Sequence, residues 1–287
     1  MTRLRAPLVA RLAARDLRHG WAATLCLIVA VAVALAPLLM LQGLRSGVVT
    51  NLIDELRSDP RIREIRLVRD SQLDQAFFDG LAADPRTGFV LPRARYLAAS
   101  VRLRSEGARS ILEPRMIPTA PGDPLLAGLA LPAGLDRIAV TERVALEAGV
   151  GPGDPVELIV LRQVGEARET LRHAATVVSV LPRDLLQTDD IFVAGALEGA
   201  IERWREGFAV PELGWEGARD GATDAENRSF ASFRLYAADV RDVPGLRDRL
   251  LAEGLDVETR AEDIEQALAI EAGLSWVFLT VAVLTGL

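Results

Sequence analysis

The stretch IAVTERVALEAGVGPGDPVEL, residues 138–158, carries the clearest succession of local structural signals in the chain. Its first three residues are apolar and predict a short strand, and residues 141–148 have the composition of a short helix. The Gly-Pro-Gly-Asp segment 151–154 then predicts a tight reversal, because glycine adopts backbone angles that other residues resist and aspartate bonds nearby amides. We interpret this turn as structural, not as a ligand site.

Further strand and helix patterns surround this stretch. Short strands at close spacing within residues 110–228 predict a β-rich part, which includes a polar, glycine-bearing segment, 212–228, expected to be an exposed loop. On either side, residues 62–104 and 233–259 each read as strand, helix, strand. We therefore expect residues 50–105 and 230–262 to pack as one α/β subdomain, with 110–228 inserted into it as a β-rich subdomain.

An apolar run without any charge extends over Trp21–Leu44. Its 24 residues exceed the roughly 20 that a helix needs to cross a bilayer core, which predicts a transmembrane helix. The arginine-rich segment before it predicts a cytoplasmic N-terminus, so that residues 45–271 form a periplasmic core domain in the cell inner membrane. A cleaved signal peptide is the alternative, but its apolar region is typically only about 7–15 residues long.

A second apolar run, residues 274–287, is too short to span a bilayer. We interpret residues 272–287 as the beginning of a second transmembrane helix in a longer protein, or as a helix lying in the membrane interface. No proline interrupts the preceding residues, which predicts one continuous helix from about Ala261. Residues 1–20 are either an amphipathic helix on the cytoplasmic membrane surface or a charged leader that sets topology. The expected fold class is thus a membrane-anchored α+β protein.

The composition excludes several kinds of function. A net charge of −7 without a long basic block argues against nucleic-acid binding. All basic residues are arginine, so neither a Schiff-base lysine nor a phosphate loop ending in lysine is present. Cys26 alone cannot form an intrachain disulfide, and His19 and His173 are too few for a zinc site. The adjacent acids Asp189 and Asp190 are expected to be solvated and not a metal pair. We predict no catalytic, cofactor-binding or metal site, and no cofactor.

Three segments together resemble the bacterial ABC-transporter permease family of the MacB, LolC/LolE and FtsX type. The first is the strand, helix and Gly-x-x-x-Gly-Asp-x-Val-x-Leu pattern that ends at Leu158. The second is the strand pair 175–181 and 190–194. The third runs from Phe233 through a helix and a strand into residues 267–287, and is similar to the family's return from its core domain into its second membrane helix.

This resemblance implies a permease subunit, or its N-terminal portion, that couples cytoplasmic ATP hydrolysis to movement of an external domain. It implies a separate cytoplasmic ATPase subunit, a second permease copy or homologue, the lipid bilayer, and a periplasmic partner or a lipoprotein, peptide or drug cargo. The chain itself would not be an enzyme. The alternative with the same topology is a two-helix sensor whose extracytoplasmic domain binds a ligand.

Overall fold

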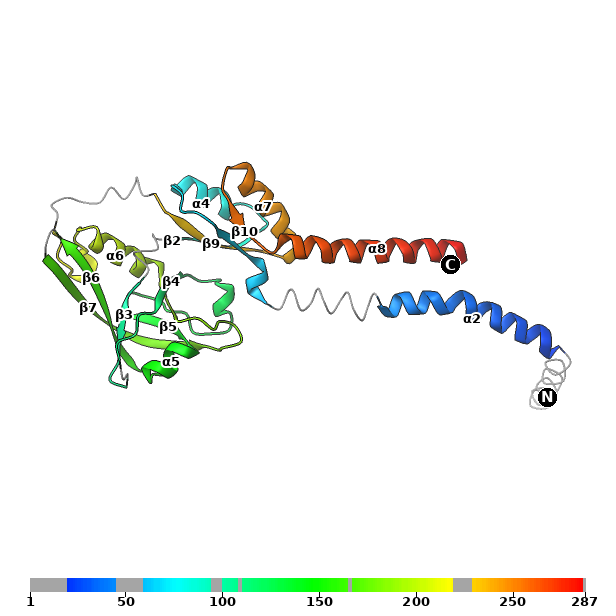
Figure 1. The fold of residues 1–287 in the computed structure, drawn as a ribbon, viewed down its shortest axis with the longest axis horizontal. Helices are drawn as coiled ribbons and strands as arrows, with labels where there is room; N and C mark the ends of the chain where they lie inside the picture. The colour runs from blue at the N-terminus through cyan, green and yellow to red at the C-terminus, as the bar shows by residue number, and fades with distance from the viewer. Residues whose placement is uncertain are drawn as a thin grey trace, which may run out of the picture. The chain divides into compact units, whose positions relative to one another are not determined.

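The computed structural model describes residues 20–44, 59–93, 100–107, 110–164, 167–218 and 229–285 (Figure 1). The chain divides into two compact units: Leu56–Ile264, and a second unit made of Met1–Glu55 with Glu265–Leu287. The predicted N-terminal segment, apart from Gly20, lies outside the described residues, as does the second half of the predicted loop 212–228.

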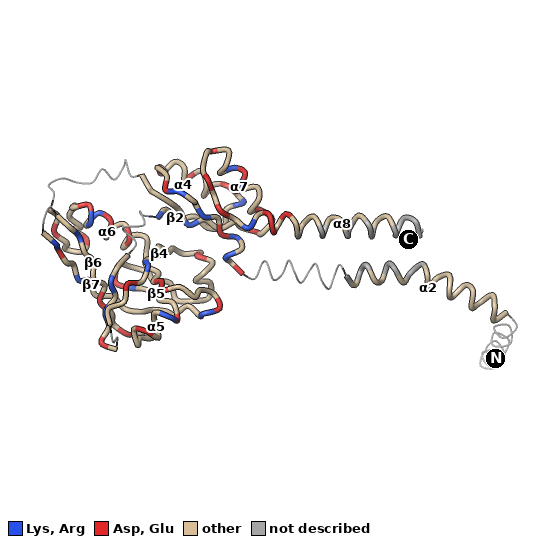
Figure 2. The backbone as a smooth tube through the Cα atoms, viewed as in Figure 1, with Lys and Arg blue, Asp and Glu red and all other residues tan. Residues whose placement is uncertain are grey.

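Helices occupy both apolar ends of the chain, α2 over Trp21–Leu44 and α8 over Ala261–Thr285, and the predicted continuous helix from Ala261 is confirmed. The prediction of a transmembrane helix over Trp21–Leu44, with a second one that begins at residue 272, is wrong. Among the described residues, no helix is both long enough and apolar enough to cross a membrane. The first turn of α8, which precedes the predicted second span, carries the exposed acids Glu262 and Asp263, and Figure 2 shows acidic residues at the start of this helix.

Three other expectations depended on the predicted transmembrane helices and are wrong as well. They are the membrane-anchored fold class, the location in the cell inner membrane and the periplasmic position of the core domain. The structure describes an α+β protein with two sheets of four and six strands.

The four-stranded sheet and its two helices follow a β-α-β-β-α-β order that resembles the ferredoxin-like motif. The strands lie in the order β10-β1-β9-β2, and all neighbours are antiparallel. Because two helical connections each skip one strand, the first and second halves of the motif interlock. The elements are β1 (Glu64–Leu67), α4 (Gln75–Ala82), β2 (Thr87–Arg93), β9 (Ser232–Ala237), α7 (Val243–Ala252) and β10 (Val257–Glu258).

Strand β2 was not among the strands expected from the sequence, and it contains the turn-forming residues Gly88 and Pro92. It lies at the edge of the sheet, where proline is tolerated because one side of the strand needs no donor. The pairing with β9 shifts register between Thr87 and Phe89. A Cβ on Gly88 would approach the Ala238 Cα to 2.9 Å, so the close approach of the two strands requires glycine there.

Asp84, in the turn between α4 and β2, ties this turn to α7. Its Oδ2 accepts from Arg86 Nη2 at 2.7 Å and from Arg249 Nη1 at 2.9 Å. The hydrogen bonds from Arg86 lead the effects that hold the pKa of the Asp84 carboxyl well below its ordinary value of 3.8. The ionised carboxylate therefore stabilises the fold at any pH above 3.8, and this stabilisation is lost as the pH falls through the lowered pKa.

We expect the variant D84N to be less stable than the natural chain near neutral pH, and the difference to shrink in acid. The measurement is urea unfolding at several values between about pH 6 and about pH 2. A difference in free energy of unfolding that stays constant over this range would contradict the assigned ion pair. Asp70, which is exposed, supplies the control variant D70N, whose free energy of unfolding should stay within about 0.5 kcal/mol of that of the natural chain.

The six-stranded sheet is mixed, with strand order β3-β6-β7-β5-β8-β4. Strands β5 and β7 pair in parallel, as do β4 and β8, and the remaining pairs are antiparallel. Its strands are β3 (Arg102–Arg104), β4 (Arg115–Thr119), β5 (Arg137–Thr141), β6 (Pro155–Val164), β7 (Ala167–Leu181) and β8 (Asp190–Ala194), with helices α5 (Glu142–Ala148) and α6 (Gly195–Arg205).

Side chains alternate between the two faces of this sheet, as the pleat requires. Ile138 and Val140 of β5 point into a core that also contains residues of α5 and α6, whereas Ala139 between them belongs to a different cluster. That second cluster contains Phe192 of β8 together with Phe89 and Tyr236 of the four-stranded sheet. The two sheets thus share one buried layer of side chains.

The expected boundary of the α/β subdomain at residue 105 is wrong. Strand β3 pairs with β6 in the six-stranded sheet, and its Leu103 is fully buried in the core beneath α5 and α6. The position beside β9 is taken by β2 instead. The four-stranded sheet therefore takes its N-terminal half only from residues up to Arg93.

Candidate functional site

The residues considered from the sequence as possible metal ligands do not come together. Asp190 is buried and accepts from Arg115 Nε and Nη2 at 2.8 and 3.1 Å. Asp189 pairs with Arg143 on α5 at 2.8 Å. The two carboxylates are thus neutralised by different arginines. Within the described ranges, no group of three or more His, Cys, Asp or Glu residues could hold a metal ion.

His173 and the predicted Gly-Asp turn have structural contacts. The His173 Nε2 lies 2.6 Å from the carbonyl oxygen of Leu135. In the turn, Gly151 N donates to Asp154 Oδ2 at 2.8 Å, and Gly153 has φ of 97°, which favours glycine. The predicted tight reversal is confirmed. His19 lies outside the described residues.

A buried ion pair connects the two sheets. Arg234 lies on β9 of the four-stranded sheet. Asp123 precedes the 3-10 helix η4 (Pro124–Leu126), which lies in the connection between β4 and β5 of the six-stranded sheet. Their side chains are 4% and 0% exposed. Arg234 Nη2 donates to Asp123 Oδ1 at 3.1 Å and Nη1 to the carbonyl oxygen of Pro118 at 2.8 Å. We call Arg234, Asp123 and Tyr236 the inter-sheet joint.

Neighbouring groups make further hydrogen bonds and a cation–π contact with the joint. Asp123 also accepts from Thr119 Oγ1 at 2.7 Å and from the backbone N–H of Leu125 at 3.0 Å. Arg234 Nη2 donates to the hydroxyl of Tyr236 at 3.3 Å. Its guanidinium carbon lies 5.6 Å from the ring centroid of Phe192, within the range of cation–π attraction. A fully bonded buried pair of this kind fixes one relative arrangement of its two elements.

The joint does not have the properties of an acid–base centre. Burial raises the pKa of Tyr236 to about 12, so its hydroxyl stays protonated at neutral pH. Burial opposes the charged form of Arg234, but the neighbouring Tyr236 and Asp123 outweigh it and raise its pKa. Neither group is poised to exchange a proton, since a catalytic group works best with a pKa near the working pH.

Helix α8 leaves the four-stranded sheet directly after β10. Its first residue, Ala261, is 1% exposed, and one turn later Ile264 is 1% exposed as well. The backbone N–H of Ala261 donates to Thr259 Oγ1 at 3.1 Å, which satisfies one of the free donors at the helix start. The first turn is therefore embedded in the same unit as the joint.

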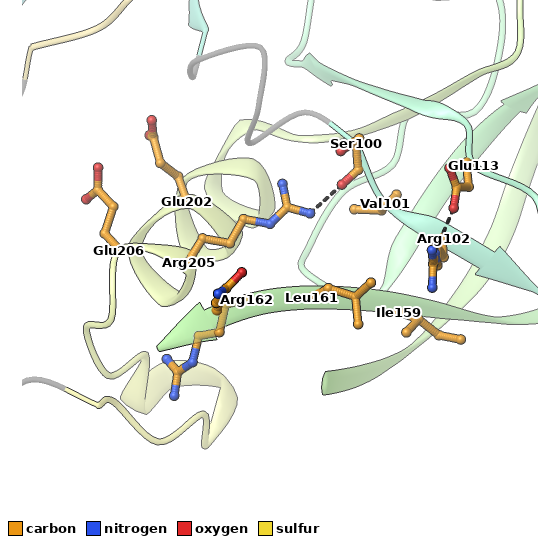
Figure 3. Close-up of a pocket in the computed structure, with 11 residues that line it drawn as sticks. Ser100, Val101, Arg102, Glu113, Ile159, Leu161, Arg162, Glu202, Arg205 and Glu206 are labelled. Atoms are coloured by element: carbon orange, nitrogen blue, oxygen red, sulfur yellow. Dashed lines mark hydrogen bonds and ion pairs between the residues drawn. The ribbon is translucent and has the colours of Figure 1, made fainter. Parts of the chain in front are cut away.

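A pocket of about 560 Å³ lies beside the edge of the six-stranded sheet. It runs between the beginning of β3, the far half of β6 and one side of α6 (Figure 3). The Arg205 side chain from α6 reaches across to donate to the carbonyl oxygen of Ser100. The lining residues are Ser100, Val101, Arg102, Glu113, Ile159, Leu161, Arg162, Gln163, Glu202, Arg205 and Glu206.

Sequence reasoning missed both the joint and the pocket. One signal for the joint was present: Arg234 is a charged residue inside the apolar strand pattern Phe233, Leu235, Tyr236, and a charge buried there needs a partner. The partner, Asp123, is 111 positions away, and nothing local indicates it. No protein-family model matches this chain, and no curated protein matches it either.

Proposed function

We propose that this chain is the non-catalytic, mechanically coupled subunit of an ABC-type system, similar to the permease family of MacB, LolC/LolE and FtsX. It works with an ATPase on a separate chain and with a second copy or homologue, and it acts on a lipoprotein, peptide or drug cargo or on a partner protein. The observation that carries the proposal is the continuous helix α8, which begins inside the folded unit and extends to Thr285.

A series of stiff connections supports this mechanical function. The first turn of α8 is buried through Ala261 and Ile264. The sheet that precedes it shares a packed layer with the six-stranded sheet and is tied to it by Arg234 and Asp123. Packed interiors are close to incompressible, so a displacement of α8 moves both sheets as one body.

The absence of lysine supports the assignment of ATP hydrolysis to another chain. A phosphate loop requires a lysine that reaches the terminal phosphates, and none of the 33 basic residues is a lysine. The two-helix sensor is the competing function. A sensor would not link ATP hydrolysis to movement of a cargo, so an assay of that linkage separates the two.

The test is a proline placed in the interior of α8. In the full chain assembled with its ATPase, we expect A269P to leave ATP hydrolysis intact and to reduce cargo release severalfold. Ala269 is exposed, so the ring removes a backbone hydrogen bond and bends the helix without disturbing the core. E262P is the matched control, because proline is tolerated in the first turn, and it should retain coupling.

Spin labels at Glu262 and Thr280 report whether the helix has bent. At 1.5 Å rise per residue, a straight helix separates these backbone positions by about 27 Å, and A269P should shorten and broaden that distance. Undiminished cargo release in a variant whose helix is demonstrably bent would rule out the rigid relay.

A further inference from the structure

Residues 207–218, which follow α6, form a compact surface loop that we call the α6 loop. Its two ends lie side by side, because the backbone N–H of Ala218 donates to the carbonyl oxygen of Gly207 at 2.8 Å. A Cβ on Gly217 would approach the Ala209 nitrogen to 2.5 Å, so this close approach requires glycine. A loop of this length whose ends meet is an Ω-loop, a type that frequently has a function.

The backbone hydrogen bonds of the α6 loop hold it together without joining it to a strand. Val210 and Trp215 bond to each other, N–H to carbonyl oxygen, at 2.9 and 3.1 Å, and the N–H of Phe208 donates to the carbonyl oxygen of Arg203 in α6 at 3.0 Å. Among the described residues, no backbone group of residues 207–218 bonds to the backbone of a strand in either sheet. The loop can therefore separate from the six-stranded sheet without breaking any strand pairing.

Apolar side chains attach the α6 loop to the core. Val210 is 0% and Trp215 7% exposed, and both belong to the cluster that contains residues of α5 and α6. Leu213 packs against the same cluster. The rings of Trp215 and of His173 on β7 meet edge to face with centroids 5.4 Å apart. Burial of these side chains favours the closed position of the loop.

Arg162 on β6 makes a polar connection between the sheet and the α6 loop. Its side chain is 4% exposed. Nη2 donates to the carbonyl oxygen of Glu216 in the loop at 3.2 Å, and Nη1 donates to that of Trp204 in α6 at 2.8 Å. The guanidinium carbon lies 4.1 Å from the centroid of the Trp204 ring, and Nε donates to Glu169 Oε2 at 2.8 Å. The donors of a guanidinium have a fixed geometry, so these contacts together hold the loop against β6.

We infer that the α6 loop is a lid that opens as one unit while the rest of the fold stays intact, and that Arg162 is the latch that holds it closed. Segments that open separately are those with few connections to the remaining structure, and the α6 loop has side-chain connections in place of strand pairing. Opening exposes the core surface beneath Val210 and Trp215 and uncovers the edge of the His173 ring. This conformational change does not depend on the proposed coupling to an ATPase.

A buried cysteine in the loop measures the opening. The chain has a single cysteine, Cys26, so V210C combined with C26S carries one thiol, at a fully buried position of the loop. V193C with C26S is the matched control, because Val193 on β8 is equally buried and is exposed only by global unfolding. We expect the thiol reagent DTNB to label V210C at least about tenfold faster than V193C under native conditions. Urea should accelerate the labelling of V193C more steeply, because global unfolding exposes more surface.

The variant R162M tests the latch, because methionine retains an unbranched side chain against Trp204 but donates no hydrogen bond. We expect R162M to raise the labelling rate of V210C about tenfold relative to that of V193C, the effect of one lost hydrogen bond from a charged group. R102Q is the matched control. Arg102 also pairs with a glutamate, but its side chain is 46% exposed and outside the loop, so the ratio of the two labelling rates should not change.

Hydrogen exchange of the unsubstituted chain tests the lid without any variant. The amides of Val210, Leu213 and Trp215 should have one common protection factor, set by the shared opening and lower than that of the β8 amides. Protection in the loop equal to that in β8, together with equal labelling of V210C and V193C, would show that the loop opens only when the whole fold unfolds. An equal acceleration of both cysteines by R162M would show that Arg162 stabilises the whole fold and is not a latch. Either result overturns the inference.

Discussion

Replacing Asp123 with alanine is expected to lower the free energy of unfolding by about 3–5 kcal/mol. The substitution leaves the guanidinium of Arg234, whose side chain is 4% exposed, without its carboxylate partner. Removal of one member of a buried pair is costly because the other charge stays buried and uncompensated. Thr119 and the backbone of Leu125 would lose their acceptor at the same time. Urea unfolding monitored by circular dichroism measures the change.

An exposed pair supplies the control for this experiment. Arg102 and Glu113 lie 2.7 Å apart with side chains 46% and 63% exposed, and E113A should cost less than about 1 kcal/mol. The double variant D123L/R234M removes both charges and should be more stable than D123A alone. If D123A and E113A unfolded at the same urea concentration, the inter-sheet joint would not be the stabilising connection described above.

Replacing Phe192 with alanine is expected to cost about 3–5 kcal/mol, the usual range for a large side chain deleted from a core. Phe192 is fully buried, and its cluster takes Phe89 and Tyr236 from the four-stranded sheet. The deletion should therefore loosen both sheets, although Phe192 belongs to only one of them. Native-state hydrogen exchange measures this, because the amides of β6 and β9 report on separate sheets.

We expect faster exchange in both strands of F192A, in step with the loss of global stability. L146A, at an exposed position of α5, should change stability by no more than about 0.5 kcal/mol. Faster exchange confined to the six-stranded sheet would show that the two sheets unfold independently, and it would remove the rigid connection on which the proposed relay depends.

Elements with strong local signals could be predicted from the sequence. The strand, helix and Gly-Asp reversal between Ile138 and Leu158 form where their residues indicate, and α8 begins at Ala261 as expected. These features depend on contacts within a few positions, such as the bond from Gly151 N to Asp154 Oδ2. Helical spacing and turn residues act over the same short range, so one sequence is enough to find them.

Features that depend on distant contacts were decided only by the tertiary structure. β3 joins the six-stranded sheet because Leu103 fits that core, and β2 forms a strand in spite of Pro92 because it lies at an edge beside β9. The partnership of Arg234 and Asp123 joins residues 111 positions apart. Such pairings depend on burial and on mutual fit across the fold, which no local pattern encodes.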